Sequence, residues 1–202
     1  MTIWCGKRPL ILASQSRTRQ MLLANAGIAC DAIPADIDER AVQEAARLTE
    51  PGAVAGLLAR VKALAVSAKN PGRHVVGADQ TLALGMRLFN KPEGRAQALA
   101  QLRALAGHTH ELHSAVAVAF DGKPVFSDIA VARMTMRRMG EGELTSYLDA
   151  AGEKVTTSVG AYQLEGLGVN LFERIEGDHF TILGLPLLSL LAYLRGQGLL
   201  GV

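Results

Sequence analysis

Short apolar runs alternate with helix-periodic segments along this chain, and that alternation limits most strongly what it can fold into. Asp121-Gly122, between two apolar runs, is a hairpin signal. Strand-like runs are expected at residues 9–13, 28–34, 74–78, 112–120 and 125–136, and helices at 17–26, 51–68, 95–105, 141–150 and 185–194. We further expect an acidic loop at 36–40, a strand or hairpin arm at 81–88, and a loop plus strand at 160–172. The pattern predicts an α/β fold with a mixed sheet.

Chain length and charge balance exclude several classes of protein. With 202 residues the chain is expected to form one domain, or one domain of two closely joined lobes. The 21 Lys and Arg against 19 Asp and Glu argue against a nucleic-acid scaffold but leave room for a local basic pocket. Apolar runs are too short for a membrane helix, and no signal-peptide pattern opens the chain. Cys5 and Cys30 are therefore expected to be reduced thiols in a cytoplasmic protein.

The turn between the first strand and the first helix contains an unusual set of side chains. Ser14 or Ser16 can cap the helix, which accounts for the serines without any ligand. Capping does not account for Arg17 and Arg19, because cations are unfavourable in a first helical turn. A bound phosphate would resolve that conflict. The residues alone leave a phosphate cradle and a simple cap both open.

Carboxylates form two further candidates. Asp79 directly follows the strand-like run at 74–78, and polar residues at strand ends of α/β folds often face a ligand; the alternative is a turn-forming aspartate. Asp36, Asp38 and Glu39 are clustered hard oxygen ligands of the kind that Mg²⁺ prefers when phosphates complete its shell. The alternative for this cluster is a solvated acidic loop.

Two lysines and three histidines complete the set of candidates. Lys62 interrupts an apolar helix and Lys91 precedes a proline; each alone is typical of a surface lysine, but with Arg19 they would supply the positive pocket that a triphosphate needs. On a strand, His108 and His110 share a face while His113 points to the other, which disfavours a zinc site. Residues 166–168 lack the third glycine of a dinucleotide fingerprint.

Taken in order, these pieces resemble the Maf family of nucleoside triphosphate pyrophosphatases from about residue 10 to residue 199. The family's opening L-A-S-x-S-P-R-R corresponds to residues 12–19, where Arg17-Thr18 replaces Pro-Arg and Arg19 matches. The other matches are Asp38-Glu39 for D-E, Lys62-Ala63 for K-A, Gly77-Ala78-Asp79 for G-x-D, Lys91-Pro92 for K-P, residues 107–110 for G-x-x-H, and Gly160-Ala161-Tyr162 with Gly184-Leu185-Pro186 for the C-terminal G-x-Y and G-L-P.

The resemblance implies an elongated mixed sheet with flanking helices, similar to inosine triphosphatases, in a single domain 1–202 whose two lobes surround a nucleotide cleft. It implies hydrolysis of a nucleoside triphosphate to the monophosphate and pyrophosphate with Mg²⁺ or Mn²⁺. The expected partner is the small nucleotide rather than nucleic acid or membrane, and homodimers are common in the family. By motif, the roles are proton acceptor for Asp79, catalytic cations for Lys62 and Lys91, substrate binding for Ser14, Ser16, Arg19 and Tyr162, and metal binding for Glu39 and Asp79.

Three positions are implied to select the base. The branch acting on dTTP and UTP has D-T and Q-G where this chain has Asp79-Gln80 and Glu165-Gly166, a pairing that resembles the 7-methyl-GTP branch. Residues 165–174 also reproduce that branch's E-G-x-G-x-x-L-F-E-R. A carboxylate at Glu165 can accept both the N1–H and N2–H₂ donors of guanine. Thr18 stands where the branch often has a bulky residue, so no ring is predicted there to stack on the base.

Other functions stay open from the sequence. A dTTP and UTP pyrophosphatase of the same family would share the catalytic motifs. A non-catalytic nucleotide-binding regulator of septum formation would bind the nucleotide without turnover. A metal-dependent phosphatase would release orthophosphate instead of pyrophosphate.

Overall fold

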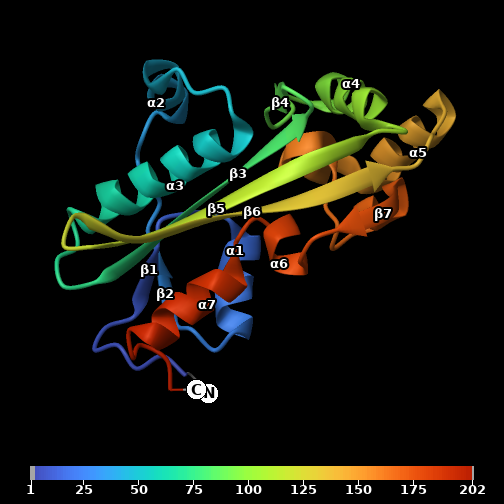
Figure 1. Cartoon of the computed structure of the whole chain (residues 1–202). Coiled ribbons are helices and arrows are strands. Elements are labelled where there is room, and N and C mark those ends of the chain that lie inside the picture. Colours follow the sequence, from blue (N-terminus) through green and yellow to red (C-terminus); the bar gives the residue numbers. More distant parts are fainter. Residues whose placement is uncertain (1–2, 202) are drawn as a thin grey trace. The chain divides into compact units, whose positions relative to one another are not determined.

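The computed structural model describes residues 3–201, and within them seven strands form one mixed sheet flanked by helices (Figure 1). Neighbouring strands follow the order β2-β1-β3-β5-β6-β7, with β4 paired to β3. The strands are β1 (Leu10–Leu12), β2 (Cys30–Ala32), β3 (His74–Leu84), β4 (Arg87–Phe89), β5 (Thr109–Phe120), β6 (Lys123–Met136) and β7 (Phe172–Glu176). β1 pairs parallel with β2 and β3, whereas β4 and β7 pair antiparallel with β3 and β6. The predicted mixed α/β fold is confirmed.

The helices are α1 (Arg17–Asn25), α2 (Glu39–Ala46), α3 (Pro51–Ser67), α4 (Arg95–Leu105), α5 (Glu141–Ala151), α6 (His179–Ile182) and α7 (Leu187–Gly196), with short 3₁₀ turns η1 (Gly152–Thr156), η2 (Val159–Ala161) and η3 (Leu167–Leu171). Each of the five predicted helical segments forms a helix whose ends differ from the prediction by at most two residues, and residues 3–201 contain two further helices, α2 and α6. The hairpin signal at residues 121–122 is confirmed: both have positive φ, 48° and 71°, as a type I′ turn requires.

Two local predictions were wrong. Residues 36–40 do not form only a loop, because the Asp38 side chain accepts a hydrogen bond from Ala41 N and starts helix α2 at Glu39. Residues 160–172 contain two 3₁₀ turns, and their strand begins only at Phe172. Glycine-rich 3₁₀ turns carry no apolar periodicity, so the sequence pattern did not reveal them.

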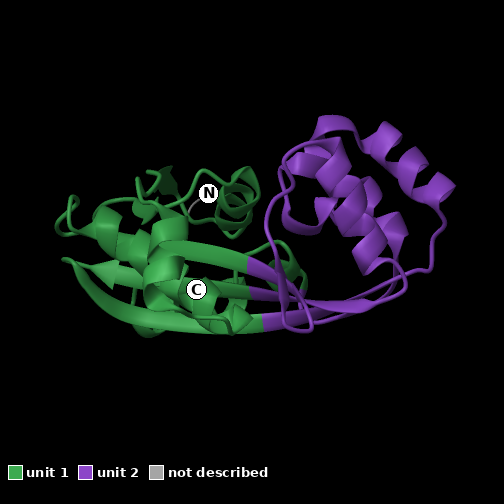
Figure 2. Cartoon of the chain, turned by 90° about the horizontal axis from the view of Figure 1, so that it is seen from above, with its two compact units in different colours: residues 1–80, 114–130, 179–202 green, residues 81–113, 131–178 purple. Residues whose placement is uncertain are grey.

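The chain divides into two compact units (Figure 2). Unit 1 takes in the described residues of segments 1–80, 114–130 and 179–202, and unit 2 takes in segments 81–113 and 131–178. The boundary falls within β3, β5 and β6, so each of these strands contributes residues to both units. The single domain expected from the resemblance stays a prediction.

Unit 1 buries both faces of its part of the sheet. Val116 and Val118 of β5 belong to an aliphatic cluster with residues of α1 and α7. Successive strand residues point to opposite faces, and the intervening alanines of β5 instead pack on α3. That second cluster consists of Ala55, Ala59, Ala63, Ala115, Ala117 and Ala119. Small side chains on both partners bring α3 close to the sheet, which matters for the site below.

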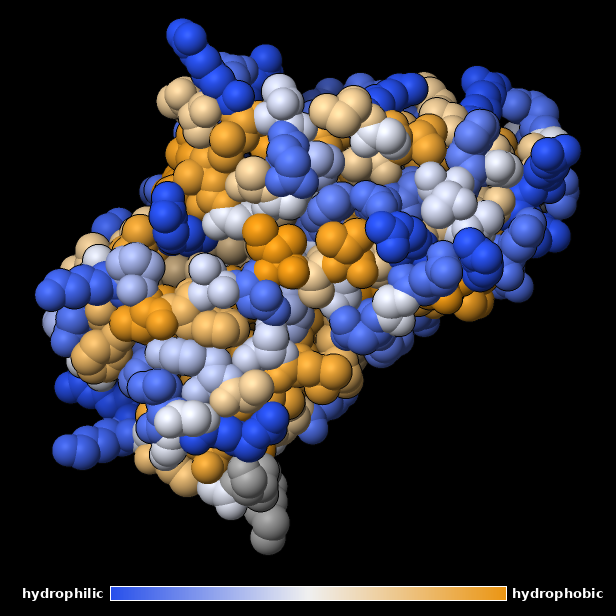
Figure 3. Space-filling view, viewed as in Figure 1, coloured by the Kyte–Doolittle hydropathy of each residue, from blue (hydrophilic) through white to orange (hydrophobic). Residues whose placement is uncertain are grey.

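Unit 2 has its own buried residues on α4 and α5, among them Leu102, Leu105, Leu144 and Leu148. Apolar and polar residues are interspersed on the face of the molecule seen in Figure 3. Across residues 3–201, no helix has both the length and the apolar character needed to cross a membrane.

Candidate active site

The turn before α1 uses both of its serines to bind backbone. Ser16 is the N-cap of the helix, and its Oγ accepts a hydrogen bond from Arg19 N at 3.3 Å. Ser14 Oγ accepts one from Ser16 N at 3.1 Å. The first turn contains no acidic residue, so nothing neutralises the positive end of the helix dipole locally. The geometry therefore combines the cap with an N-terminus suited to an anion.

Arg19 is held in one orientation by the surrounding backbone. Its Nε donates to Gly184 O at 2.7 Å, and its Nη1 donates to Ala78 O at 2.8 Å and to Ser14 Oγ at 3.4 Å. Burial lowers the pKa of the guanidinium, while Asp79 and Glu39 act in the opposite direction. Arginine nevertheless stays charged in proteins. Arg19 as a whole is half-buried, and no hydrogen bond from its Nη2 is found among the described residues. Nη2 is therefore the guanidinium nitrogen that keeps hydrogen-bonding capacity for an anion, whereas the neighbouring Arg17 is exposed.

Lys62, Asp79 and Glu39 meet in the same unit. Lys62 Nζ lies 2.6 Å from Asp79 Oδ1 and 2.9 Å from Glu39 Oε1. Lys62 and Asp79 are each 8% exposed, so the pair is buried, whereas Glu39 is open to solvent. Burial raises the pKa of Asp79, Lys62 and Arg19 lower it, and Glu39 raises it again, with a net increase. Asp79 is thus a carboxylate whose proton affinity is increased by its surroundings.

Asp79 does not follow a strand, as the sequence suggested, but lies within the eleven residues of β3. Close packing of α3 brings Lys62 to it. A Cβ on Gly77 would lie 2.1 Å from Ala59 O and 2.6 Å from Ala63 N, so only glycine allows α3 this near to β3. Lys62 adjoins Ala63 on the same helix, and Asp79 is two residues beyond Gly77 on the same strand face.

The donor set fits a hard divalent cation. Glu39 and Asp79 each bring a carboxylate oxygen to Lys62 Nζ, so the two carboxylates converge on one region. Mg²⁺ is commonly held by one or two carboxylates together with substrate phosphates and water. No cluster of three or more His, Cys, Asp or Glu within residues 3–201 is arranged to hold a metal by itself. A cation here would share its shell with the substrate.

Gln80 turns its amide to the backbone of unit 1. Its Nε2 lies 2.9 Å from Ser114 Oγ and 3.1 Å from both Thr181 O and Ile182 O. Thr18 is a half-buried residue of α1. Neither Ser114 nor the turn at 181–184 was assigned a role from the sequence, although Gly184-Leu185-Pro186 was recognised as a motif.

The remaining predicted residues lie in unit 2. Lys91 and Glu165 are exposed. Tyr162 is 5% exposed, and its hydroxyl lies 2.7 Å from His110 Nε2. Burial raises the pKa of the Tyr162 phenol above its usual range and lowers the pKa of His110 to about 4. The structure therefore brings Ser14, Ser16, Arg19, Glu39, Lys62, Asp79 and Gln80 together in unit 1 and holds Lys91, Tyr162 and Glu165 in unit 2.

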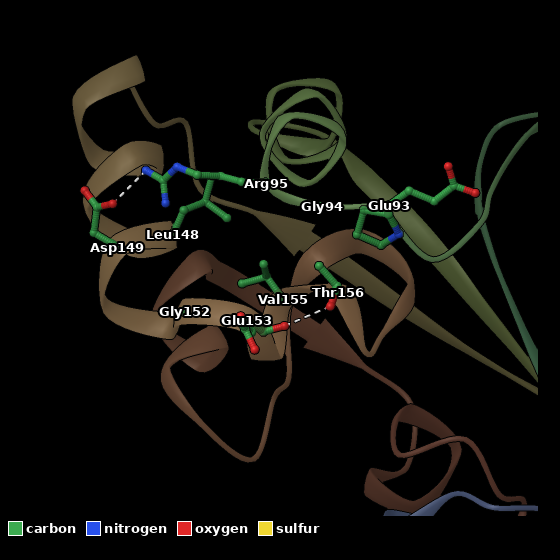
Figure 4. Close-up of a pocket in the computed structure, with 10 residues that line it drawn as sticks. Glu93, Gly94, Arg95, Leu148, Asp149, Gly152, Glu153, Val155 and Thr156 are labelled. Atoms are coloured by element: carbon green, nitrogen blue, oxygen red, sulfur yellow. Dashed lines mark hydrogen bonds and ion pairs between the residues drawn. The ribbon is translucent and has the colours of Figure 1, made fainter.

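A surface pocket of about 760 Å³ lies within unit 2 (Figure 4). Its walls are the start of α4 and the region where α5 meets η1. Arg95 Nη2 and Asp149 Oδ1 form an ion pair of 2.7 Å at its edge. Pro92, next to the predicted Lys91, lines it, but none of the predicted site residues does.

Comparison with known proteins extends over almost the whole chain. A model of the family described as Maf-like protein matches residues 9–197. A nucleoside triphosphate pyrophosphatase of Bradyrhizobium diazoefficiens is 71% identical, and one of Rhodopseudomonas palustris is 65% identical, each over 100% of both chains. A 7-methyl-GTP pyrophosphatase of Brucella abortus is 52% identical over 93% of this chain and 96% of its own. The motifs in unit 1, the family match and these full-length relatives agree, and the chain belongs to the Maf family.

Proposed function

We propose that this nucleoside triphosphate pyrophosphatase of the Maf family acts with Mg²⁺ on a modified guanine nucleotide of the 7-methyl-GTP type. The observation that carries the chemistry is the buried Asp79, 2.6 Å from Lys62, beside an Arg19 whose Nε and Nη1 are held by backbone and whose Nη2 keeps hydrogen-bonding capacity for a ligand. A carboxylate, a fixed guanidinium and a helix N-terminus are the groups that phosphoryl transfer needs for proton transfer and charge stabilisation.

Each site residue has a separate role in the proposed reaction. Arg19 Nη2 and the N-terminus of α1 bind phosphate oxygens. Asp79 accepts a proton from a water whose oxygen forms a bond to the α-phosphorus, and the bond from that phosphorus to the bridging oxygen breaks. The electron pair leaves with pyrophosphate, and the other product is the nucleoside monophosphate. Lys62 favours the ionised form of Asp79 and so opposes the effect of burial. Mg²⁺ bound by Glu39 and Asp79 would neutralise phosphate charge.

The choice of a guanine base is proposed from Glu165. Its carboxylate can accept the two adjacent donors of the guanine edge, which uracil and thymine lack. The 52% identical relative from Brucella abortus, a 7-methyl-GTP pyrophosphatase, supports the same choice. Gln80 and Thr18 occupy the other two positions at which the family branches differ.

A screen of canonical and methylated nucleoside triphosphates with Mg²⁺, scored for pyrophosphate, tests the reaction. We expect release from 7-methyl-GTP, abolished in Asp79→Asn but retained in Asp128→Asn, which changes a half-buried aspartate of β6. Release of orthophosphate would instead indicate a phosphatase. Binding without turnover, unchanged in Asp79→Asn, would indicate a regulator.

Exchange of one carboxylate tests the base preference. Glu165→Gln is expected to lower kcat/KM for guanine nucleotides relative to UTP by about 10- to 100-fold, because one good bidentate base contact contributes on the order of 1–3 kcal/mol. Glu173→Gln, another exposed glutamate of unit 2, should leave the ratio unchanged. A wild-type preference for dTTP or UTP would refute the role given to Glu165.

A further inference from the structure

Two side chains of the sheet bind carbonyl groups of the last residues of α6, where the 181–184 turn begins. Ser114 Oγ donates to Thr181 O at 2.6 Å. Gln80 Nε2 lies within 3.1 Å of Thr181 O and Ile182 O, and 2.9 Å from Ser114 Oγ. Because the Ser114 hydroxyl gives its proton to Thr181, it can only accept from Gln80. All three neighbours of the amide are therefore acceptors, which fixes its NH₂ group toward them.

The same turn holds Arg19. Gly184 N donates to Thr181 O at 3.0 Å, and Gly184 O accepts the hydrogen bond from Arg19 Nε at 2.7 Å. Gly184 has a φ of +88°, and a Cβ there would lie 3.3 Å from Arg19 Nη2. The position of the Gly184 carbonyl thus depends on where Thr181 is held, and the orientation of the guanidinium depends on that carbonyl.

The burial of Ser114 calls for an explanation. It is 0% exposed on β5, and the five residues that follow it there are alanine or valine, all of them buried. An apolar residue would fill such a position without the cost of burying a hydroxyl. Within residues 3–201, the partners of the hydroxyl are the Gln80 amide and the Thr181 carbonyl.

We propose that Ser114 is a positioning residue, which together with Gln80 fixes the 181–184 turn and so orients Arg19 toward the triphosphate. This inference rests on the proposed function. It assigns Gln80 an indirect part, since its NH₂ group is already used within unit 1. Because Arg19 would contact phosphate oxygens, loss of the Ser114 hydroxyl should weaken the binding of all nucleoside triphosphates by the same factor, whatever their base.

The test compares two buried serines of unit 1. Ser114→Ala removes the hydroxyl that binds the turn. Ser67→Ala is the matched control, because Ser67 is 1% exposed and its Oγ accepts a hydrogen bond from Gly122 N at the β5–β6 hairpin, at 3.0 Å. The measurements are the Kd of inorganic tripolyphosphate by calorimetry, the KM values of GTP and UTP, and the thermal midpoint of each variant.

For Ser114→Ala we expect the Kd and both KM values to rise about tenfold, the size of effect of one hydrogen bond to a charged network. Ser67→Ala should lower the thermal midpoint similarly and leave the three constants unchanged. Unchanged constants in Ser114→Ala, or a loss confined to one base, would overturn the proposal. If Ser114→Ala does not fold, Gln80→Leu, which removes the other support of the turn, must show the same uniform loss.

The wild-type protein separates this proposal from the function on which it rests. If no nucleoside triphosphate yields pyrophosphate, the proposed function fails, yet tripolyphosphate binding still decides the role of Ser114. If wild-type protein does not bind tripolyphosphate, Arg19 is not a phosphate ligand and the positioning role is overturned.

Discussion

Opposing electrostatic effects act on the carboxyl group of Asp79. Burial favours its neutral form, and the nearby Glu39 charge does so as well, whereas Lys62 and Arg19 favour the ionised form. The result is a pKa above the ordinary carboxyl value. A buried ion pair of this kind contributes little net stability, because desolvation offsets most of its attraction. In the proposed reaction its value is chemical, since a raised pKa makes a carboxylate a better proton acceptor.

Removal of the lysine charge should move the pH profile. Asp79 must be ionised to accept a proton, so activity is present above its pKa and is lost as the pH falls through it. Lys62→Met removes the nearest positive charge and raises that pKa further. We expect the acid limb of kcat/KM to shift to higher pH and activity to fall. Lys69→Met, which changes an exposed lysine just beyond α3, should leave the acid limb of the kcat/KM profile at the wild-type pH. An unshifted limb in Lys62→Met would exclude Asp79 as the titrating base.

At the scale of elements, helix α3 and strand β3 pack closely and hold the Lys62–Asp79 pair of the candidate site. The helix presents a row of alanines to the alanines of β5, and Gly77 lets its backbone approach β3. Lys62 and Asp79 face each other because of this approach. The Lys62–Asp79 ion pair therefore depends on small side chains elsewhere in the interface between α3 and the sheet.

Enlarging Gly77 tests this dependence. In Gly77→Ala the new methyl group would overlap Ala59 O, at 2.1 Å, and α3 would have to move away from the sheet. We expect a loss of about 3 kcal/mol in unfolding free energy, the upper part of the range for overpacking, and reduced kcat/KM as Lys62 moves with the helix. Gly196→Ala in α7, where a Cβ meets nothing within 4 Å, should change neither the unfolding free energy nor kcat/KM. Denaturant unfolding and steady-state kinetics measure both; equal stability of the two variants would contradict the packing argument.

At the scale of the whole molecule, the proposed roles are divided between the two units. Unit 1 contains the groups proposed for phosphate, metal and proton transfer, and unit 2 contains Lys91, Tyr162 and Glu165. Unit 2 also buries His110, whose Nδ1 has no hydrogen-bond partner among the described residues. The cost of charging such a ring makes folding itself sensitive to pH.

His110 should destabilise the fold in mild acid. Burial lowers its pKa to about 4 in the folded chain, against an ordinary value of 6.5. Between these two pH values the unfolded chain binds a proton that the folded chain does not. The free energy of unfolding therefore decreases as the pH is lowered through this window, by at most about 3 kcal/mol. His110→Gln, which does not titrate, should flatten the change in unfolding free energy between pH 6.5 and pH 4. The exposed His108→Gln should keep the wild-type slope, and an equal slope in all three proteins would refute the assignment.

The sequence alone determined the order and type of most elements, the mixed sheet and the motif residues, because periodicity, capping and turn chemistry are local properties. Helices α2 and α6 and the 3₁₀ turns were not predicted, because each is shorter than the window of roughly 11–18 residues over which a helical period can be read. Only the tertiary structure decided that Arg19 meets Gly184, 165 residues away in sequence, and that Ser114 and Gln80 hold that turn. A buried serine on an apolar strand has no local signature, since its purpose depends on carbonyl groups that folding brings to it from distant segments of the chain.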